Sequence, residues 1–216
     1  MDSQHQPLET LKDIRRMMER SSRFISLSGW SGISAGICAL AGAWAAGDRI
    51  RSYHVTPGEV QSRSSRPIGG ADFSLMTDLV WISIITFLAA LVSAFIFTWL
   101  RSRRHGIPLW DRTVQRLTWN TLLPMAVGGL VILRSIQLDH YELVVPGCLI
   151  FYGLALVNAS KYTLGEVRWL GYGQLLLGMI SLWVSGQGLY FWAAGFGILH
   201  IIYGALMWWK YERVSQ

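Results

Sequence analysis

Six long runs of apolar residues, separated by shorter polar segments, dominate this chain. The runs cover residues 24–46, 78–100, 117–138, 143–160, 167–186 and 189–209. Each is close to the 20 or so residues that an α-helix needs to cross a hydrocarbon core of about 30 Å. Helices of a water-soluble protein would be shorter and would show a polar face. The pattern therefore predicts an all-α, polytopic membrane protein with six transmembrane helices.

A shorter amphipathic segment precedes the first run. Leu8, Leu11, Ile14 and Met18 recur at helical spacing, which predicts an amphipathic helix within residues 1–23. Such a helix either lies on the membrane surface and orients the first span or docks a cytosolic protein. The segment is long and carries charges of both signs, unlike the start of a cleaved signal peptide. We therefore interpret the first run as a retained anchor.

The connections between the runs differ greatly in length. Residues 47–77 form a long, polar connection rich in Gly, Pro and Ser, which we expect to be a mobile outer loop. Residues 139–142 and 186–188 are short turns, and short turns join antiparallel neighbours. The domain organisation predicted is a six-helix bundle over 24–209, followed by a cytoplasmic tail over 210–216.

The distribution of Lys and Arg predicts the orientation. Six spans place both termini on one side, and a cytoplasmic N-terminus puts most of the 19 basic residues inside, as the positive-inside rule requires. The formal net charge of +6 is explained by this topology, so no nucleic-acid partner is expected. The basic residues on the predicted cytoplasmic side are Lys12, Arg15, Arg16, Arg20, Arg23, Arg101, Arg103, Arg104, Arg112, Arg116, Lys161, Arg168, Lys210 and Arg213.

Stripes of small residues mark two of the predicted spans. Gly32 and Gly36 form a small-xxx-small pattern in the first span, and Gly197 and Gly204 share a face of the sixth span with His200. Such stripes let two helix backbones approach closely. They predict either packing inside the bundle or a homodimer interface.

A few polar residues interrupt the apolar runs. Asn120 and Arg134 lie roughly on one face of the third span, Gln174 lies in the fifth, and His200 lies near the middle of the sixth. These faces either line a small hydrated cavity or form hydrogen bonds between helices. Asp78 begins the second span at its outer end.

The third span contains two further features that need partners. Pro124 has no amide hydrogen, so a backbone carbonyl of that span is left for a neighbour or a water to satisfy. Arg134 lies about one turn from the outer end. It either extends outward or pairs with Asp78, Asp139 or Glu142.

The sequence offers little catalytic chemistry. It contains no H-E-x-x-H, G-x-S-x-G or Walker motif and no paired intramembrane aspartates. Cys38 and Cys148 fall in apolar runs and are expected to be free thiols. A haem would need a second axial histidine at the depth of His200, and the other histidines lie in loops or flanks. We therefore predict no metal and no cofactor, and an enzyme is disfavoured.

Three runs carry a resemblance to a known family. They are MERSSRFISLSG at residues 18–29, LALVNASKYTL at 154–164 and GFGILHIIYG at 195–204. Together they resemble a family of small, uncharacterised bacterial inner-membrane proteins with about six helices. The resemblance implies a location in the bacterial inner (plasma) membrane, and it brings no established activity, cofactor or partner. It also implies that Asn158, Lys161, Tyr162 and His200 belong to recurring runs, so Asn158 joins the candidate residues.

Three functions are compatible with these sequence features. The first is a non-enzymatic scaffold or regulatory component, embedded in the lipid bilayer, whose cytoplasmic face meets a partner protein. The second is a small-solute permease or channel built from the polar faces around His200. The third is a membrane enzyme, which would need at least two reactive groups within hydrogen-bonding reach.

Overall fold

The computed structural model describes residues 28–55, 70–105 and 112–213 of the chain, and every regular element in these ranges is helical. The all-α class predicted from the sequence is therefore confirmed. The predicted amphipathic helix within residues 1–23 and the middle of the predicted outer loop, residues 56–69, lie outside the described residues.

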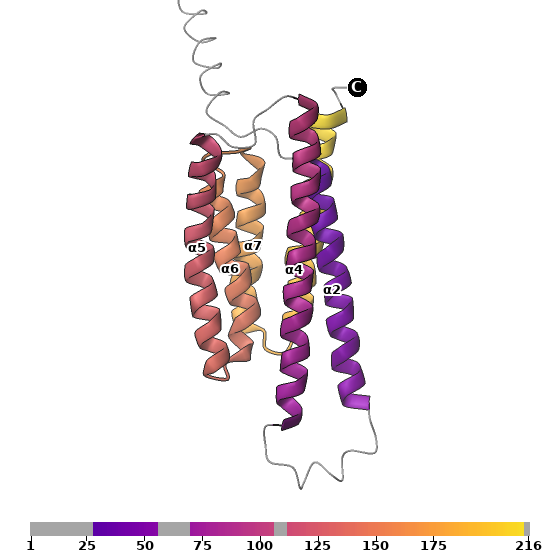
Figure 1. Cartoon of the computed structure of the whole chain (residues 1–216). Helices are drawn as coiled ribbons and strands as arrows, with labels where there is room; N and C mark the ends of the chain where they lie inside the picture. The colour runs from indigo at the N-terminus through magenta and orange to yellow at the C-terminus, as the bar shows by residue number, and fades with distance from the viewer. Residues whose placement is uncertain (1–27, 56–69, 106–111, 214–216) are drawn as a thin grey trace, which may run out of the picture.

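The described helices form six rods (Figure 1). Five of them are α2 (Gly29–Val55), α4 (Gly70–His105), α5 (Arg112–Gln137), α6 (Val144–Ala159) and α7 (Glu166–Trp183). A short 3-10 turn, η1 (Tyr141–Leu143), leads into α6. The last rod, called the sixth rod below, consists of α8 (Gly188–Trp192), η2 (Ala193–Leu199), α9 (His200–Met207) and η3 (Trp208–Glu212).

The rods coincide with the six apolar runs, but several boundaries differ from those predicted. The run at 78–100 lies within α4, which is 36 residues long, and α2 continues to Val55, into what the sequence analysis assigned to the outer loop. The run at 167–186 ends as a helix at Trp183. Helical backbone hydrogen bonds thus continue past the ends of the apolar runs.

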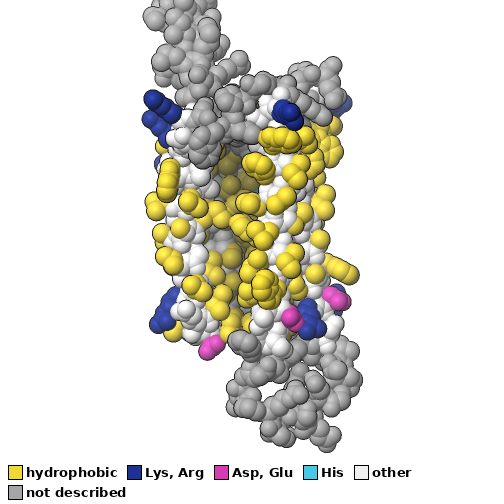
Figure 2. Space-filling model, in the orientation of Figure 1, with side chains coloured by type: hydrophobic (Ala, Val, Ile, Leu, Met, Phe, Trp, Pro, Cys, Tyr) yellow, Lys and Arg dark blue, Asp and Glu magenta, His cyan; other side chains and the backbone are white. Residues whose placement is uncertain are grey.

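Successive rods alternate in direction, so that α2 begins and the sixth rod ends at the same end of the bundle (Figure 1). We call this the basic end. Figure 2 shows hydrophobic side chains along the rods and charged side chains near their ends. The described basic residues at the basic end are Arg101, Arg103, Arg112, Arg116, Lys161, Arg168, Lys210 and Arg213. The opposite end mixes Arg49, Arg51 and Arg134 with Asp48, Asp78, Asp139 and Glu142.

The rods pack in a row whose order differs from their order in the sequence. From one edge to the other the row runs α5, α6, α7, the sixth rod, α2 and α4. The sixth rod therefore lies between α7 and α2, and α4 and α5 form the two edges. Among the described helices, α4 packs mainly on α2, and α5 mainly on α6.

Glycines allow the closest contacts in this row. A Cβ atom on Gly204 would lie 2.5 Å from the Gly29 carbonyl oxygen and 2.6 Å from the Ile33 nitrogen. One on Gly36 would lie 2.7 Å from the Gly197 carbonyl oxygen. These backbones touch because the side chains are absent. The stripe at Gly32, Gly36, Gly197 and Gly204 is thus occupied within the chain, by α2 against the sixth rod.

Four of the helical segments are long and apolar enough to cross a membrane. They are Ser74–Arg103, Arg112–Gln137, Tyr141–Ala159 and Gly188–Tyr211. The apolar side chains of α4 are mostly exposed, for example Ile85 at 62% and Phe95 at 61%. Exposed apolar surface on this scale suits a lipid environment and not water. The protein is therefore a helical protein suited to a membrane.

Candidate functional site

A histidine lies buried where the sixth rod packs against α6. His200, the first residue of α9, is only 7% exposed. Its Nε2 atom lies 2.9 Å from the Tyr152 hydroxyl oxygen on α6, and its Nδ1 atom lies 3.1 Å from the Gly195 carbonyl oxygen. Because a carbonyl only accepts, we assign the proton to Nδ1, and Nε2 then accepts from Tyr152. Both ring nitrogens of a neutral imidazole are used in this way.

The same carbonyl also binds α7. Gln174 is fully buried, and its Nε2 atom donates to the Gly195 oxygen over 2.8 Å. One backbone oxygen therefore connects the sixth rod to α7 directly and to α6 through His200. The other amide atom of Gln174, Oε1, has no hydrogen-bond partner among the described residues.

The backbone at Gly195 is unusual in two ways that make this contact possible. It lies in η2, a π-helical segment, whose wider turn often occurs at functional or strained positions. A Cβ atom here would lie 2.4 Å from Leu149 Cδ2 and 2.7 Å from Gln174 Oε1, so a larger residue would displace both side chains. Sequence reasoning did not select Gly195. The signal available was a glycine five residues before an intramembrane histidine, within a run already singled out.

Aromatic rings enclose the histidine. The Tyr152 ring lies 5.5 Å from the imidazole and 5.3 Å from the Phe196 ring, centroid to centroid. Phe196 also contacts Trp192 at 4.6 Å. The imidazole is therefore held by two hydrogen bonds inside an aromatic environment.

Asn120 and Asn158 form a separate polar contact between α5 and α6. Pro124 cannot bond to the Asn120 carbonyl oxygen four residues before it. The side-chain amide of Asn158 donates to that oxygen over 2.8 Å. The neighbour that the sequence analysis required for the freed carbonyl is thus a side chain of α6.

Arg134 and Asp78 lie apart from both groups. Arg134 is exposed at the opposite end and donates to Gln137 Oε1 of its own helix over 3.3 Å. Asp78 pairs instead with Arg49 of α2, whose Nε atom lies 2.7 Å from its carboxylate. The Arg134–Asp78 pair considered from the sequence is therefore wrong. Arg49 was overlooked because it was assigned to the outer loop rather than to α2.

A charged contact closes the basic end between α7 and the sixth rod. Glu166 accepts hydrogen bonds from Lys210 Nζ and from the Tyr211 hydroxyl, the latter at 2.9 Å. Partial burial alone would raise the pKa of Glu166. The hydrogen bonds and the Lys210 charge outweigh this, so the pKa lies below its ordinary value.

The candidate residues therefore fall into separate groups. Gln174 and His200 meet at Gly195, Asn120 meets Asn158, and Arg134 and Asp78 have their own partners at the opposite end. The four residues considered for a common cavity are divided among these groups. Among the described residues, no cluster of three His, Cys, Asp or Glu side chains could hold a metal ion. The hydrogen bonds of the first two groups join neighbouring helices.

No protein-family model, curated protein or solved structure matches the chain. The resemblance to a bacterial inner-membrane family therefore stays a prediction.

Proposed function

We propose that this protein is a non-enzymatic component of a bacterial inner (plasma) membrane, acting as a scaffold or regulator. The observation that carries the proposal is how its buried polar side chains are used. Hydrogen bonds between neighbouring helices use the side chains of Tyr152, Asn158, Gln174 and His200. Polar residues in membrane helices commonly stabilise helix packing in this way. The family resemblance of the three sequence runs points to the same location.

All six rods cross the bilayer in this proposal. The short connections on both sides of α7 support it, because residues 160–165 and 184–187 join rods that run in opposite directions. At 27 residues, α2 extends about 40 Å, enough to span the core. The glycine, serine and glutamine that α2 and α7 carry are used in packing at the centre of the row.

Both termini lie in the cytoplasm in this orientation. The basic end carries most of the described Lys and Arg and one described acidic side chain, Glu166, whereas the opposite end mixes both signs. This asymmetry supports a cytoplasmic basic end, because short cytoplasmic loops carry an excess of Lys and Arg. The turn at residues 160–165 lies on this face, where the exposed Gly165 can meet a cytosolic partner.

Photo-crosslinking in cells tests the scaffold proposal. A photoreactive amino acid at Gly165, where a Cβ atom meets nothing within 4 Å, probes the proposed cytoplasmic face. The matched control is Gln187, an exposed residue in the turn at the opposite end. We expect a discrete crosslinked cytosolic protein from position 165 and none from position 187. Crosslinks from neither position, or from 187 alone, would contradict the proposal.

A small-solute permease is the second candidate, and one specific observation favours it. Gln174 Oε1, Ser181 Oγ and Tyr203 Oη are buried without hydrogen-bond partners among the described residues. Unpaired buried polar atoms are costly and often mark sites of water or ligand. Purified protein in liposomes tests this: a permease would lose flux of protons or small solutes on His200→Ala. Flux equal to that of protein-free liposomes, before and after the substitution, supports the scaffold instead.

A further inference from the structure

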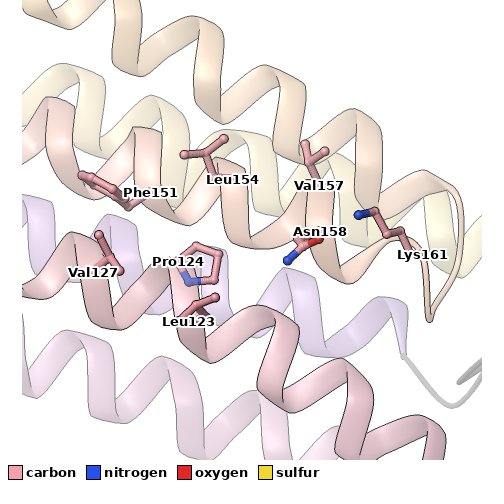
Figure 3. A pocket seen from close by; sticks show the side chains of 8 residues that line it. All are labelled: Leu123, Pro124, Val127, Phe151, Leu154, Val157, Asn158 and Lys161. Carbon is pink, nitrogen blue, oxygen red and sulfur yellow. The ribbon is translucent and has the colours of Figure 1, made fainter.

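An apolar groove follows the contact between α5 and α6 on the outside of the bundle. It has a volume of about 460 Å³. Leu123, Pro124 and Val127 line it from α5, and Phe151, Leu154, Val157 and Asn158 from α6, with Lys161 at its end (Figure 3). From Phe151 to Lys161 the groove follows α6 for about 15 Å, the thickness of one leaflet of the hydrocarbon core.

A second hollow, of about 780 Å³, adjoins the first at the basic end. It is lined by Ser160, Lys161, Gly165, Glu166, Arg168, Trp169 and Tyr172. Lys161 belongs to both hollows, and Figure 3 shows its amine turned toward the groove. The apolar groove, which is about as long as one leaflet is thick, therefore opens into a polar hollow at the helix ends.

The charge of the polar hollow is positive. Lys161 is exposed and has no side-chain partner among the described residues. Arg168 is also exposed, and among the described residues its guanidinium donates from Nε to Ser160 Oγ over 3.3 Å and from no other nitrogen. Glu166 is already neutralised by Lys210, which lies outside both hollows. Two cations are thus available to a ligand and the carboxylate is not.

We propose that these two hollows together bind one anionic phospholipid of the leaflet at the basic end. One acyl chain lies in the groove against Val127, Phe151 and Leu154. The phosphate lies between the Lys161 ammonium and the Arg168 guanidinium, which supply the charge-assisted donors that phosphate prefers. Trp169, which is 75% exposed and packs edge-on against Tyr172, borders the headgroup at the depth where indole rings gather. The inference goes beyond the proposed function and requires only that the bundle is embedded in lipid.

Binding of defined lipids to the full-length protein in neutral detergent, measured by native mass spectrometry, tests the charged part. We expect phosphatidylglycerol to bind saturably and more tightly than phosphatidylcholine with the same acyl chains. Lys161→Gln and Arg168→Gln should each weaken phosphatidylglycerol binding about fivefold, the factor for about 1 kcal/mol per basic residue at a membrane surface. The matched control is Arg103→Gln, an exposed cation at the same end on α4, which should leave binding unchanged.

Two further experiments test whether an acyl chain lies in the groove and whether the bound phosphate belongs to a lipid. Leu154→Trp fills the groove and should weaken binding, whereas Leu130→Trp, on an exposed position of α5 outside the groove, should not. Inorganic phosphate should fail to displace the lipid. Equal binding of the two lipids, equal loss with Arg103→Gln, no loss with Leu154→Trp, or displacement by inorganic phosphate would each overturn the proposal.

Discussion

The interface between α2 and the sixth rod differs from the interface between α5 and α6 in what the glycines meet and in the space left over. In the first, glycines face each other and the two backbones touch. In the second, a glycine, Gly128, packs against a large side chain, Phe151, one amide crosses between the helices, and a groove remains open to the outside. A stripe of small residues thus produces a closed contact, whereas bulky residues around a proline leave space that a lipid chain can fill.

The largest loss of stability is expected from a substitution that separates α2 from the sixth rod. Gly204→Leu places its Cβ atom 2.5 Å from a backbone oxygen of α2, so the two helices must separate. We expect a loss of about 3 kcal/mol or more in the free energy of unfolding. Thermal unfolding in detergent, followed by circular dichroism, measures it.

The control for this substitution lies on α5. A Cβ atom at Gly129 meets nothing within 4 Å, so Gly129→Leu should change stability by about 0.5 kcal/mol or less. Equal losses from the two substitutions would show that glycine serves helix flexibility in general and not this close contact.

A smaller loss of stability is expected at the polar contact between the sixth rod and α6. His200→Ala removes a buried ring and leaves the Tyr152 hydroxyl and the Gly195 carbonyl each without one partner. We expect a loss of about 2 kcal/mol, from a cavity and from unpaired polar groups. Tyr152→Phe removes one hydrogen bond alone and should cost about 0.6 kcal/mol. Urea unfolding in mixed micelles compares the two, and a Tyr152→Phe loss as large as that of His200→Ala would contradict this account of the site.

The open interface gives a prediction through a double-mutant cycle. Asn158→Leu removes the donor to the Asn120 carbonyl and should cost about 0.6 kcal/mol. Pro124→Ala restores the missing backbone amide, which bonds to the same carbonyl. Asn158→Leu should therefore cost almost nothing in the Pro124→Ala background. Additive losses would mean that Asn158 does not act on the carbonyl that proline leaves free.

The smallest effect is expected at the exposed pair that closes the basic end. The pKa of Glu166 in the folded protein is lowered, so its stabilising contribution is present above the ordinary pKa of about 4.5 and is lost as the pH falls through the folded value. Glu166→Gln should lower the midpoint of thermal unfolding by about 1 °C near neutral pH. This difference should shrink as the pH falls below about 4.5 and vanish below the lowered folded pKa, where the carboxyl group is protonated in both states. A difference that grows in acid would contradict the sign of the shift.

The sequence predicted the rods well because each needs only a local apolar run, and stripes such as Gly32 and Gly36 mark where a helix approaches another. It could not show which helix is the partner, since the row order depends on all six faces at once. The π-helical segment around Gly195 has no local signature that distinguishes it from ordinary helix. The Asp78–Arg49 pair was missed because α2 continues beyond its apolar run.

In the proposed topology, all six rods cross the bilayer with the basic end in the cytoplasm. Fusions of green fluorescent protein and of alkaline phosphatase after Gln216, expressed in a bacterial host, report the side of the C-terminus directly. The orientation proposed here predicts a fluorescent first fusion and an inactive second one. An active phosphatase and a dark fluorescent protein would place the basic end outside and contradict it.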